Sequence, residues 1–128
     1  DLLHAGHILM LKEIKSQCHY LIVGLQSDPS IDRNNKNSPI QSVEERRIQL
    51  DAVKYVDQII EYDTEEELVN LLDEIRPEIR FVGADWEGNP NLTGVDLPIK
   101  IVYNTRDHNY STTELRNRIF KSNISFKI

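Results

Sequence analysis

The sequence predicts a three-layer α/β fold, with a mainly parallel sheet covered by helices on both faces. Short apolar runs typical of buried strands alternate along the chain with helical patterns of about three turns, which implies right-handed crossovers between parallel strands. Ser/Thr-x-x-Glu capping boxes mark three of the helix starts. With 128 residues, 39% of them hydrophobic, the chain fits one domain with one core.

The first helix and the first strand are predicted from the spacing of apolar residues. Ile8, Leu9, Leu11 and Ile14 recur at helical spacing, and residues 20–26 then form a short, nearly continuous apolar run. The first two elements of the chain are therefore predicted to be a helix and then a strand.

Three later helices are predicted from their capping boxes, and each follows a polar loop. The boxes pair Ser42 with Glu45, Thr64 with Glu67, and Ser111 with Glu114. Pro77 ends the helix that Thr64 opens. The remaining strands are expected at residues 58–62, 79–84 and 99–104, which completes a Rossmann-like alternation of strands and helices.

Composition and charge exclude several classes of protein. The net charge of −6 leaves no basic stripe for a nucleic-acid backbone, so we expect no nucleic-acid partner. No apolar run approaches the roughly 18 to 20 residues of a membrane span, so we expect no membrane insertion. A single cysteine, Cys18, cannot form an internal disulfide, which favours a cytoplasmic protein.

The opening segment DLLHAGH predicts an anion site. His4 and His7 flank Gly6 where the first helix begins, beside unpaired backbone N–H groups and the positive end of the helix dipole. In parallel α/β sheets such helix starts lie at the ligand-binding edge. The histidines could also be metal ligands, but no third ligand has a recognisable spacing, or they could be merely structural.

Five elements in order resemble the HIGH-type nucleotidyltransferases, in particular the cytidylyltransferase-like branch typified by glycerol-3-phosphate cytidylyltransferase. They are DLLHAGH, SVEERR (42–47), KYVDQII (54–60), GADWEG (83–88) and RDHNYSTTELR (106–116). The resemblance runs the whole length of the chain and places each element at an expected helix start or strand end.

The resemblance implies that CTP and a small phosphorylated acceptor, glycerol 3-phosphate or a similar molecule, give a CDP-linked product and pyrophosphate. The acceptor phosphate attacks the α-phosphorus in line and needs no general base, because its second pKa near 6 leaves it largely dianionic at neutral pH. Mg²⁺ would share the negative charge, near Asp1 or Asp85.

The resemblance also assigns residues to roles. The catalytic set comprises His4, His7, Lys36 and Arg106. The nucleotide-binding set comprises Asp1, Gly6, Asp85, Trp86, Ser111, Thr112 and Thr113. Arg46 and Lys54 are assigned to the substrate, where Lys54 replaces the usual arginine. Asp107 and Asn109 replace a usual threonine and glycine, which leaves the acceptor open among glycerol 3-phosphate, phosphocholine, phosphoethanolamine and sugar or polyol phosphates.

Two alternatives remain at this point: an adenylyltransferase that uses ATP on the same fold, and a non-catalytic nucleotide-binding relative. We expect residues 1–128 to form a single nucleotidyltransferase domain. The family's first strand would precede Asp1, so about ten further residues are expected upstream. The resemblance also implies a homodimer with the YVD segment (55–57) near the interface.

Overall fold

The structure, a computed structural model, describes residues 1–126 and shows the predicted alternation of helices and strands. The elements are α1 (Ala5–Lys15), β1 (Ile22–Gln26), α2 (Val43–Asp51), β2 (Gln58–Tyr62), α3 (Glu65–Ile75), β3 (Ile79–Gly83), the 3₁₀ turn η1 (Ala84–Trp86), β4 (Lys100–Asn104) and α4 (Thr112–Phe126). Every helix and strand expected from the sequence is present.

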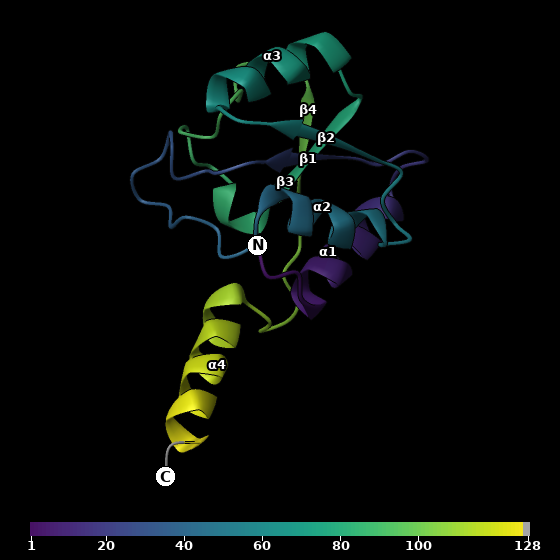
Figure 1. Cartoon of the computed structure of the whole chain (residues 1–128). Helices are drawn as coiled ribbons and strands as arrows, with labels where there is room; N and C mark the ends of the chain where they lie inside the picture. The colour runs from purple at the N-terminus through teal and green to yellow at the C-terminus, as the bar shows by residue number, and fades with distance from the viewer. Residues whose placement is uncertain (127–128) are drawn as a thin grey trace.

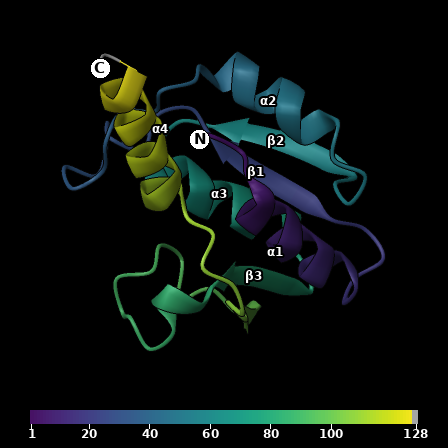
Figure 2. The ribbon, with the colours of Figure 1, turned by 90° about the horizontal axis from the view of Figure 1, so that it is seen from below.

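The helices form two layers around the strands. In Figure 1, α3 lies on one side of the strands, while α1 and α2 lie on the other side. The view from below in Figure 2 agrees, since α1 is seen in front of the strands and α3 behind them. The three-layer α/β arrangement predicted from the sequence is therefore confirmed.

The strands are parallel, but they form two pairs rather than one sheet. β1 pairs with β2 with Ile22 opposite Gln58, and β3 pairs with β4 with Ile79 opposite Lys100. Within the described residues, neither β1 nor β3 has a hydrogen-bonded strand on its other side. The strands and their parallel direction agree with the sequence prediction, whereas the single sheet expected from local periodicity is found as two separate pairs.

The core lies between α1 and the strands. Leu11 and Ile14 of α1 and Leu21 before β1 are buried and in contact. Partly buried side chains surround them: Met10, Cys18, Val23, Leu50, Val53, Tyr55, Val56 and Phe81. Because this core fixes α1 against the strands, it also fixes the position of the helix N-terminus.

The predicted capping residues are found at the helix starts. The Ser42 side chain accepts from the backbone N–H of Glu45, and the Glu45 side chain accepts from that of Ser42, which completes the box. Ser111 Oγ likewise accepts from the N–H of Glu114 at the start of α4. Thr64 Oγ1 accepts from the N–H of Glu67 at the start of α3, while the Glu67 side chain accepts from the N–H of Asp63. All three predicted N-caps are therefore found, and the full reciprocal box is seen at Ser42.

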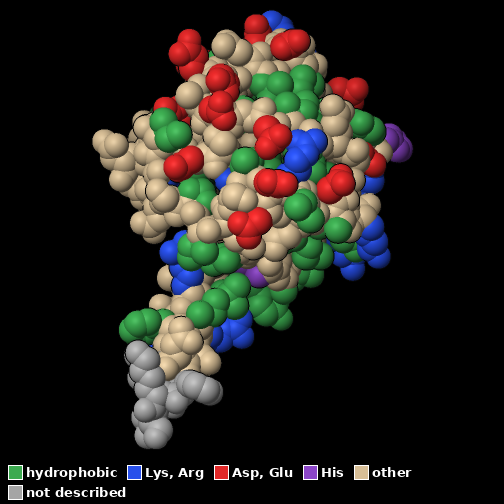
Figure 3. Space-filling model, viewed as in Figure 1, with side chains coloured by type: hydrophobic (Ala, Val, Ile, Leu, Met, Phe, Trp, Pro, Cys, Tyr) green, Lys and Arg blue, Asp and Glu red, His purple; other side chains and the backbone are tan. Residues whose placement is uncertain are grey.

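Helix α4 extends away from the rest of the molecule, as the yellow ribbon in Figure 1 shows. Ile119 and Phe120 on this helix are exposed. In Figure 3, hydrophobic side chains lie along α4, whereas acidic side chains gather over the end of the molecule that carries α3. Among residues 1–126, no helix combines the length and the apolar character needed to cross a bilayer.

Candidate functional site

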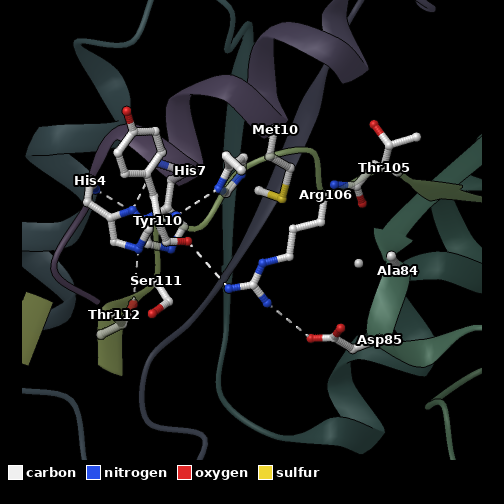
Figure 4. Close-up of a pocket in the computed structure, with 14 residues that line it drawn as sticks. His4, His7, Met10, Ala84, Asp85, Thr105, Arg106, Tyr110, Ser111 and Thr112 are labelled. Carbon is white, nitrogen blue, oxygen red and sulfur yellow. Dashed lines mark hydrogen bonds and ion pairs between the residues drawn. The ribbon is translucent and has the colours of Figure 1, made fainter. Parts of the chain in front are cut away.

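A pocket of about 230 Å³ lies where the N-termini of α1 and α4 meet the carboxyl ends of β3 and β4. This is the edge at which ligands bind in parallel α/β folds. In Figure 4, the side chains from α1, from the segment after β4 and from η1 converge on this pocket. Three segments far apart in the sequence, residues 4–10, 83–85 and 104–112, therefore build one site.

His4 and His7 form a capping box at the start of α1. His4 Nδ1 accepts from the backbone N–H of Gly6 at 3.0 Å, and His7 Nδ1 accepts from the backbone N–H of His4 at 3.1 Å. The two rings lie 4.0 Å apart between centroids. The sequence analysis missed this box because histidine is not a preferred cap, although the spacing of the two residues matches that of Ser-x-x-Glu.

The cap determines where each ring carries its proton. A ring nitrogen that accepts a hydrogen bond is unprotonated, so a neutral imidazole held through Nδ1 carries its proton on Nε2. His4 Nε2 lies 3.3 Å from Thr112 Oγ1 at the start of α4. Both histidines therefore present Nε2–H donors, which suits a site for phosphate oxygens.

Both rings are held in the neutral form. Burial, followed by the proximity of His4, lowers the pKa of His7 to about 4. Burial is also the main cause that lowers the pKa of His4, and His108 acts in the same direction. At neutral pH the two rings are donors without a positive charge.

A third histidine, His108, lies beside this pair. Its Nδ1 accepts from the backbone N–H of Tyr110 at 3.1 Å, so it too is held through Nδ1. A Cβ on Gly6 would lie 2.8 Å from His4 Cε1 and 2.9 Å from His108 Cε1, so glycine is required for both rings to fit. Sequence spacing gave His108 no role, because His4 and Gly6, which it approaches at the start of α1, are about 100 residues away along the chain.

The α4 side of the pocket carries the residues that the sequence placed in a second phosphate cradle. Ser111 and Thr112 line the pocket, whereas Thr113 is exposed and does not. The Arg106 guanidinium forms an ion pair with Asp85 at 3.6 Å and donates to the carbonyl oxygen of Tyr110 at 3.4 Å. Figure 4 shows this guanidinium between the histidine side of the pocket and Asp85.

Three other residues that the sequence assigned to the site do not line this pocket. Lys36 is exposed on the loop between β1 and α2, and Lys54 is exposed, with its Nζ 5.3 Å from the centre of the Tyr55 ring. Trp86 lines a separate cavity and lies under the guanidinium of Arg33, 5.1 Å from the ring centre. Their roles remain predictions that rest on the sequence.

Asp1 and Arg46 hold main-chain segments in place. The Asp1 carboxylate accepts from the backbone N–H groups of Ile40 and Gln41, each at 3.0 Å, and pairs with Arg116 at 3.4 Å. The Asp1 oxygens are therefore already engaged by backbone and arginine donors, and Asp1 does not line the pocket.

Arg46 is only 6% exposed, and its guanidinium donates to three backbone carbonyls. These belong to Gln26 at 2.7 Å, Gln41 at 3.2 Å and Ser27. This placement gives Arg46 a structural role that the sequence did not predict, and it lends no support to the predicted contact with substrate. An arginine inside an amphipathic helix carries no signal that distinguishes a buried guanidinium from an exposed one.

Among the residues that the structure describes, no cluster of three or more His, Cys, Asp or Glu side chains is arranged to hold a metal ion. Asp85 is the carboxylate that lines the pocket, and its side chain is 82% exposed. Mg²⁺ typically takes one or two carboxylates together with substrate phosphates, and this donor set fits an ion that binds together with a nucleotide.

The profile of the cytidylyltransferase-like family matches residues 1–118, which is most of the chain. The chain belongs to the cytidylyltransferase-like family. The chain is similar to the glycerol-3-phosphate cytidylyltransferase of Bacillus subtilis, which is 30% identical over 120 residues, covering 93% of this chain and 90% of that protein. The nucleotidyltransferase resemblance stated from the motifs is therefore confirmed at the level of the family.

Other relatives are much longer than this chain. The bifunctional protein HldE of Wolinella succinogenes is 39% identical over 98 residues, which covers 76% of this chain but 20% of that protein. The chain thus spans between a fifth and about a quarter of the length of the HldE proteins it matches. The lipopolysaccharide core biosynthesis protein of Thermoplasma volcanium has a similar structure, with a TM-score of 0.67, 29% identity and coverage of 84% of this chain and 91% of that one.

Proposed function

We propose that the protein is a cytidylyltransferase that joins CTP to a small phosphorylated acceptor and releases pyrophosphate. The observation that carries this proposal is the fixed pair of Nε2–H donors: His4 and His7 are locked through Nδ1 at the N-terminus of α1, in the same pocket as Arg106 and the start of α4. The similarity to a glycerol-3-phosphate cytidylyltransferase over nearly the whole chain supports the choice of substrates.

The reaction requires positioning and charge stabilisation rather than a base. An oxygen of the acceptor phosphate forms a bond to the α-phosphorus of CTP, the bridging bond between the α- and β-phosphates breaks, and its electron pair leaves with pyrophosphate. The attacking phosphate is largely dianionic at pH 7, so no proton has to be removed from it. This agrees with histidines whose lowered pKa values keep them as neutral donors.

The side chains of the pocket would stabilise the negative charge that develops. The Nε2–H groups of His4 and His7 donate to phosphate oxygens, and the start of α4 offers backbone N–H groups and hydroxyls to the triphosphate. Arg106 releases Asp85 and pairs with phosphate oxygens, which it can contact in a bidentate manner.

Asp85 is then the carboxylate available to Mg²⁺ carried by the nucleotide, and the ion would neutralise part of the triphosphate charge. The predicted alternative, Asp1, has its oxygens already engaged by two backbone N–H groups and Arg116. Asp85 is therefore the more suitable of the two predicted carboxylates.

The acceptor is a small phosphate monoester of the glycerol 3-phosphate type. The segment after β4, where this chain has Asp107, borders the pocket. An added carboxylate at this position favours an acceptor that carries hydroxyl groups or a positive charge. We also propose a homodimer, as the sequence resemblance implies, and a cytoplasmic location, which the single cysteine favours. Light scattering of the purified protein tests its mass in solution.

The decisive experiment is a pyrophosphate-release assay with a matrix of substrates. CTP and ATP are each combined with Mg²⁺ and with glycerol 3-phosphate, phosphocholine, phosphoethanolamine and a sugar phosphate. We expect turnover with CTP and one acceptor, and loss of at least about 100-fold in His7→Asn. Turnover with ATP alone would establish an adenylyltransferase instead. Nucleotide binding without turnover on any acceptor would identify a non-catalytic relative.

A further inference from the structure

Asn104 is a buried polar side chain in this pocket with an unsatisfied oxygen. It is the last residue of β4, lies opposite Gly83 in the strand register and is 7% exposed. Its Oδ1 is buried and has no hydrogen-bond partner among the described residues. Leaving such an acceptor unpaired destabilises the folded state, so native proteins usually provide it with a partner.

The ligand's phosphates cannot be that partner. A triphosphate at neutral pH offers acceptor oxygens, and the pocket meets them with donors: two Nε2–H groups, the Arg106 guanidinium and the hydroxyls at the start of α4. An unpaired acceptor such as Asn104 Oδ1 would repel a phosphate oxygen. Asn104 therefore needs a ligand group that bears an N–H or O–H.

The surroundings of Asn104 differ from the phosphate end of the pocket. A Cβ placed on Gly83 would meet no atom within 4 Å, and Ala84 follows it, so the floor beside Asn104 is open and uncharged. In Figure 4, Ala84 lies on the opposite side of the Arg106 guanidinium from His4 and Thr112. Beyond the guanidinium the pocket is therefore lined by Ala84 and the Asp85 carboxylate, neither of which donates to phosphate, and this part suits a nucleobase rather than a phosphate group.

We propose that Asn104 binds the nucleobase through the edge that bears an exocyclic amino group beside an unprotonated ring nitrogen. A carboxamide supplies one acceptor and one donor side by side, and this edge of cytosine or adenine offers the complementary pair. Oδ1 is occluded and unpaired in the free protein, so the carboxamide turns about its Cβ–Cγ bond when the base binds; Oδ1 then accepts from the amino group, and Nδ2 donates to the ring nitrogen. This assignment rests on the proposed nucleotidyl transfer in the same pocket and adds a residue that selects the base.

If Asn104 had a purely structural role, replacing it would lower the stability of the ligand-free protein. Asn104 contributes no side-chain hydrogen bond to the described part of the fold, so its carboxamide does not stabilise the folded state in this way. Leucine, of similar branching, would remove the unpaired oxygen without leaving a cavity. We therefore expect the melting temperature of ligand-free Asn104→Leu to equal or exceed that of the wild type.

The test is calorimetric titration of the wild type, Asn104→Leu and Asn104→Asp with four probes, each with Mg²⁺ and without acceptor. The probes are CTP, ATP, the 2′,3′-dideoxy form of whichever of these binds more tightly, and inorganic tripolyphosphate. We expect Asn104→Leu to weaken binding of the better nucleotide by about 10- to 100-fold and to leave tripolyphosphate affinity unchanged. Asn104→Asp, which keeps acceptors but loses the donor, should also weaken nucleotide binding.

Each outcome of the titrations either supports or overturns the proposed contact between Asn104 and the nucleobase. If Asn104→Leu loses the same factor in affinity for the nucleotide and for its dideoxy form, Asn104 contacts the base. If the variant loses affinity for the nucleotide but not for the dideoxy form, Asn104 contacts the ribose, and the proposal is overturned. Unchanged nucleotide affinity, or an equal loss for tripolyphosphate, also overturns it while leaving nucleotidyl transfer intact. A wild type that binds no nucleotide refutes the proposed function and this inference together.

Discussion

At the scale of single residues, each site histidine uses its two ring nitrogens for different purposes. In His4 and His7, Nδ1 caps the first turn of α1, which leaves Nε2 for the pocket. A serine or asparagine could supply the cap, but neither has a donor that extends as far from the backbone as Nε2 of histidine. This explains why a histidine pair occupies positions where shorter caps are usual.

The capping of α1 by His4 Nδ1 and the donation to phosphate by His4 Nε2–H can be separated by substitution. Asparagine places an acceptor near the position of Nδ1 and is among the best N-cap residues, but it has nothing in place of Nε2. We expect His4→Asn to stay within about 1 kcal/mol of wild-type stability while losing at least about 100-fold in turnover. His4→Ala should lose both the cap and the turnover. Urea unfolding combined with pyrophosphate release measures the two properties.

The control for these variants is His19, which is exposed and lies outside the pocket. His19→Asn should leave stability and turnover unchanged. Near-normal turnover of His4→Asn would show that the Nε2–H of His4 is not needed for the reaction.

At the scale of secondary-structure elements, Arg46 connects α2 to the end of β1. Its donors reach the carbonyls of Gln26 and Ser27 at the end of that strand and of Gln41 just before α2. A buried arginine that satisfies three carbonyls fixes two segments of backbone with one side chain. The chain direction after β1 depends on this contact.

Replacing Arg46 should therefore destabilise the protein, and its neighbour Arg47 provides a matched control. Arg46→Met leaves the three carbonyls without their donors, and we expect a loss of about 2–4 kcal/mol in the free energy of unfolding. Arg47 is on the same helix, is 45% exposed and pairs with Glu61 at 3.1 Å. Arg47→Met should change stability by less than about 1 kcal/mol. Similar losses in both variants would contradict the structural role of Arg46.

At the scale of the whole molecule, local sequence patterns predicted the helices and strands, whereas tertiary packing determines which side chains meet in the pocket and in the core. The apolar spacing around Leu11 and the cap at Ser42 act within a few residues, so sequence reading found them. The burial of Arg46 and the approach of His108 and Asn104 to α1 depend on contacts across most of the chain. No local pattern carries that information.

The stability of the whole molecule should depend on pH through the site histidines. His7 has a pKa of about 4 in the folded protein, against about 6.5 for an unfolded chain, so between these values the unfolded chain binds more protons. The contribution of His7 to stability is therefore fully present above about pH 7 and is lost as the pH drops from 6.5 toward 4. The pKa of His4 is also lowered, so it acts in the same direction.

We expect the free energy of unfolding to fall by on the order of 1–2 kcal/mol between pH 7.5 and pH 5, allowing for partial screening of the half-buried ring by water. Lowered carboxyl pKa values, as at Asp28 and Asp57, keep those groups ionised across this range and separate the histidine effect from acid unfolding. Urea unfolding at several pH values measures the slope. His7→Asn keeps a cap acceptor but cannot titrate, so its slope should be clearly smaller. A variant slope equal to that of the wild type would mean that His7 is not held neutral in the folded protein, and that its Nε2–H is not the uncharged donor on which the proposed mechanism depends.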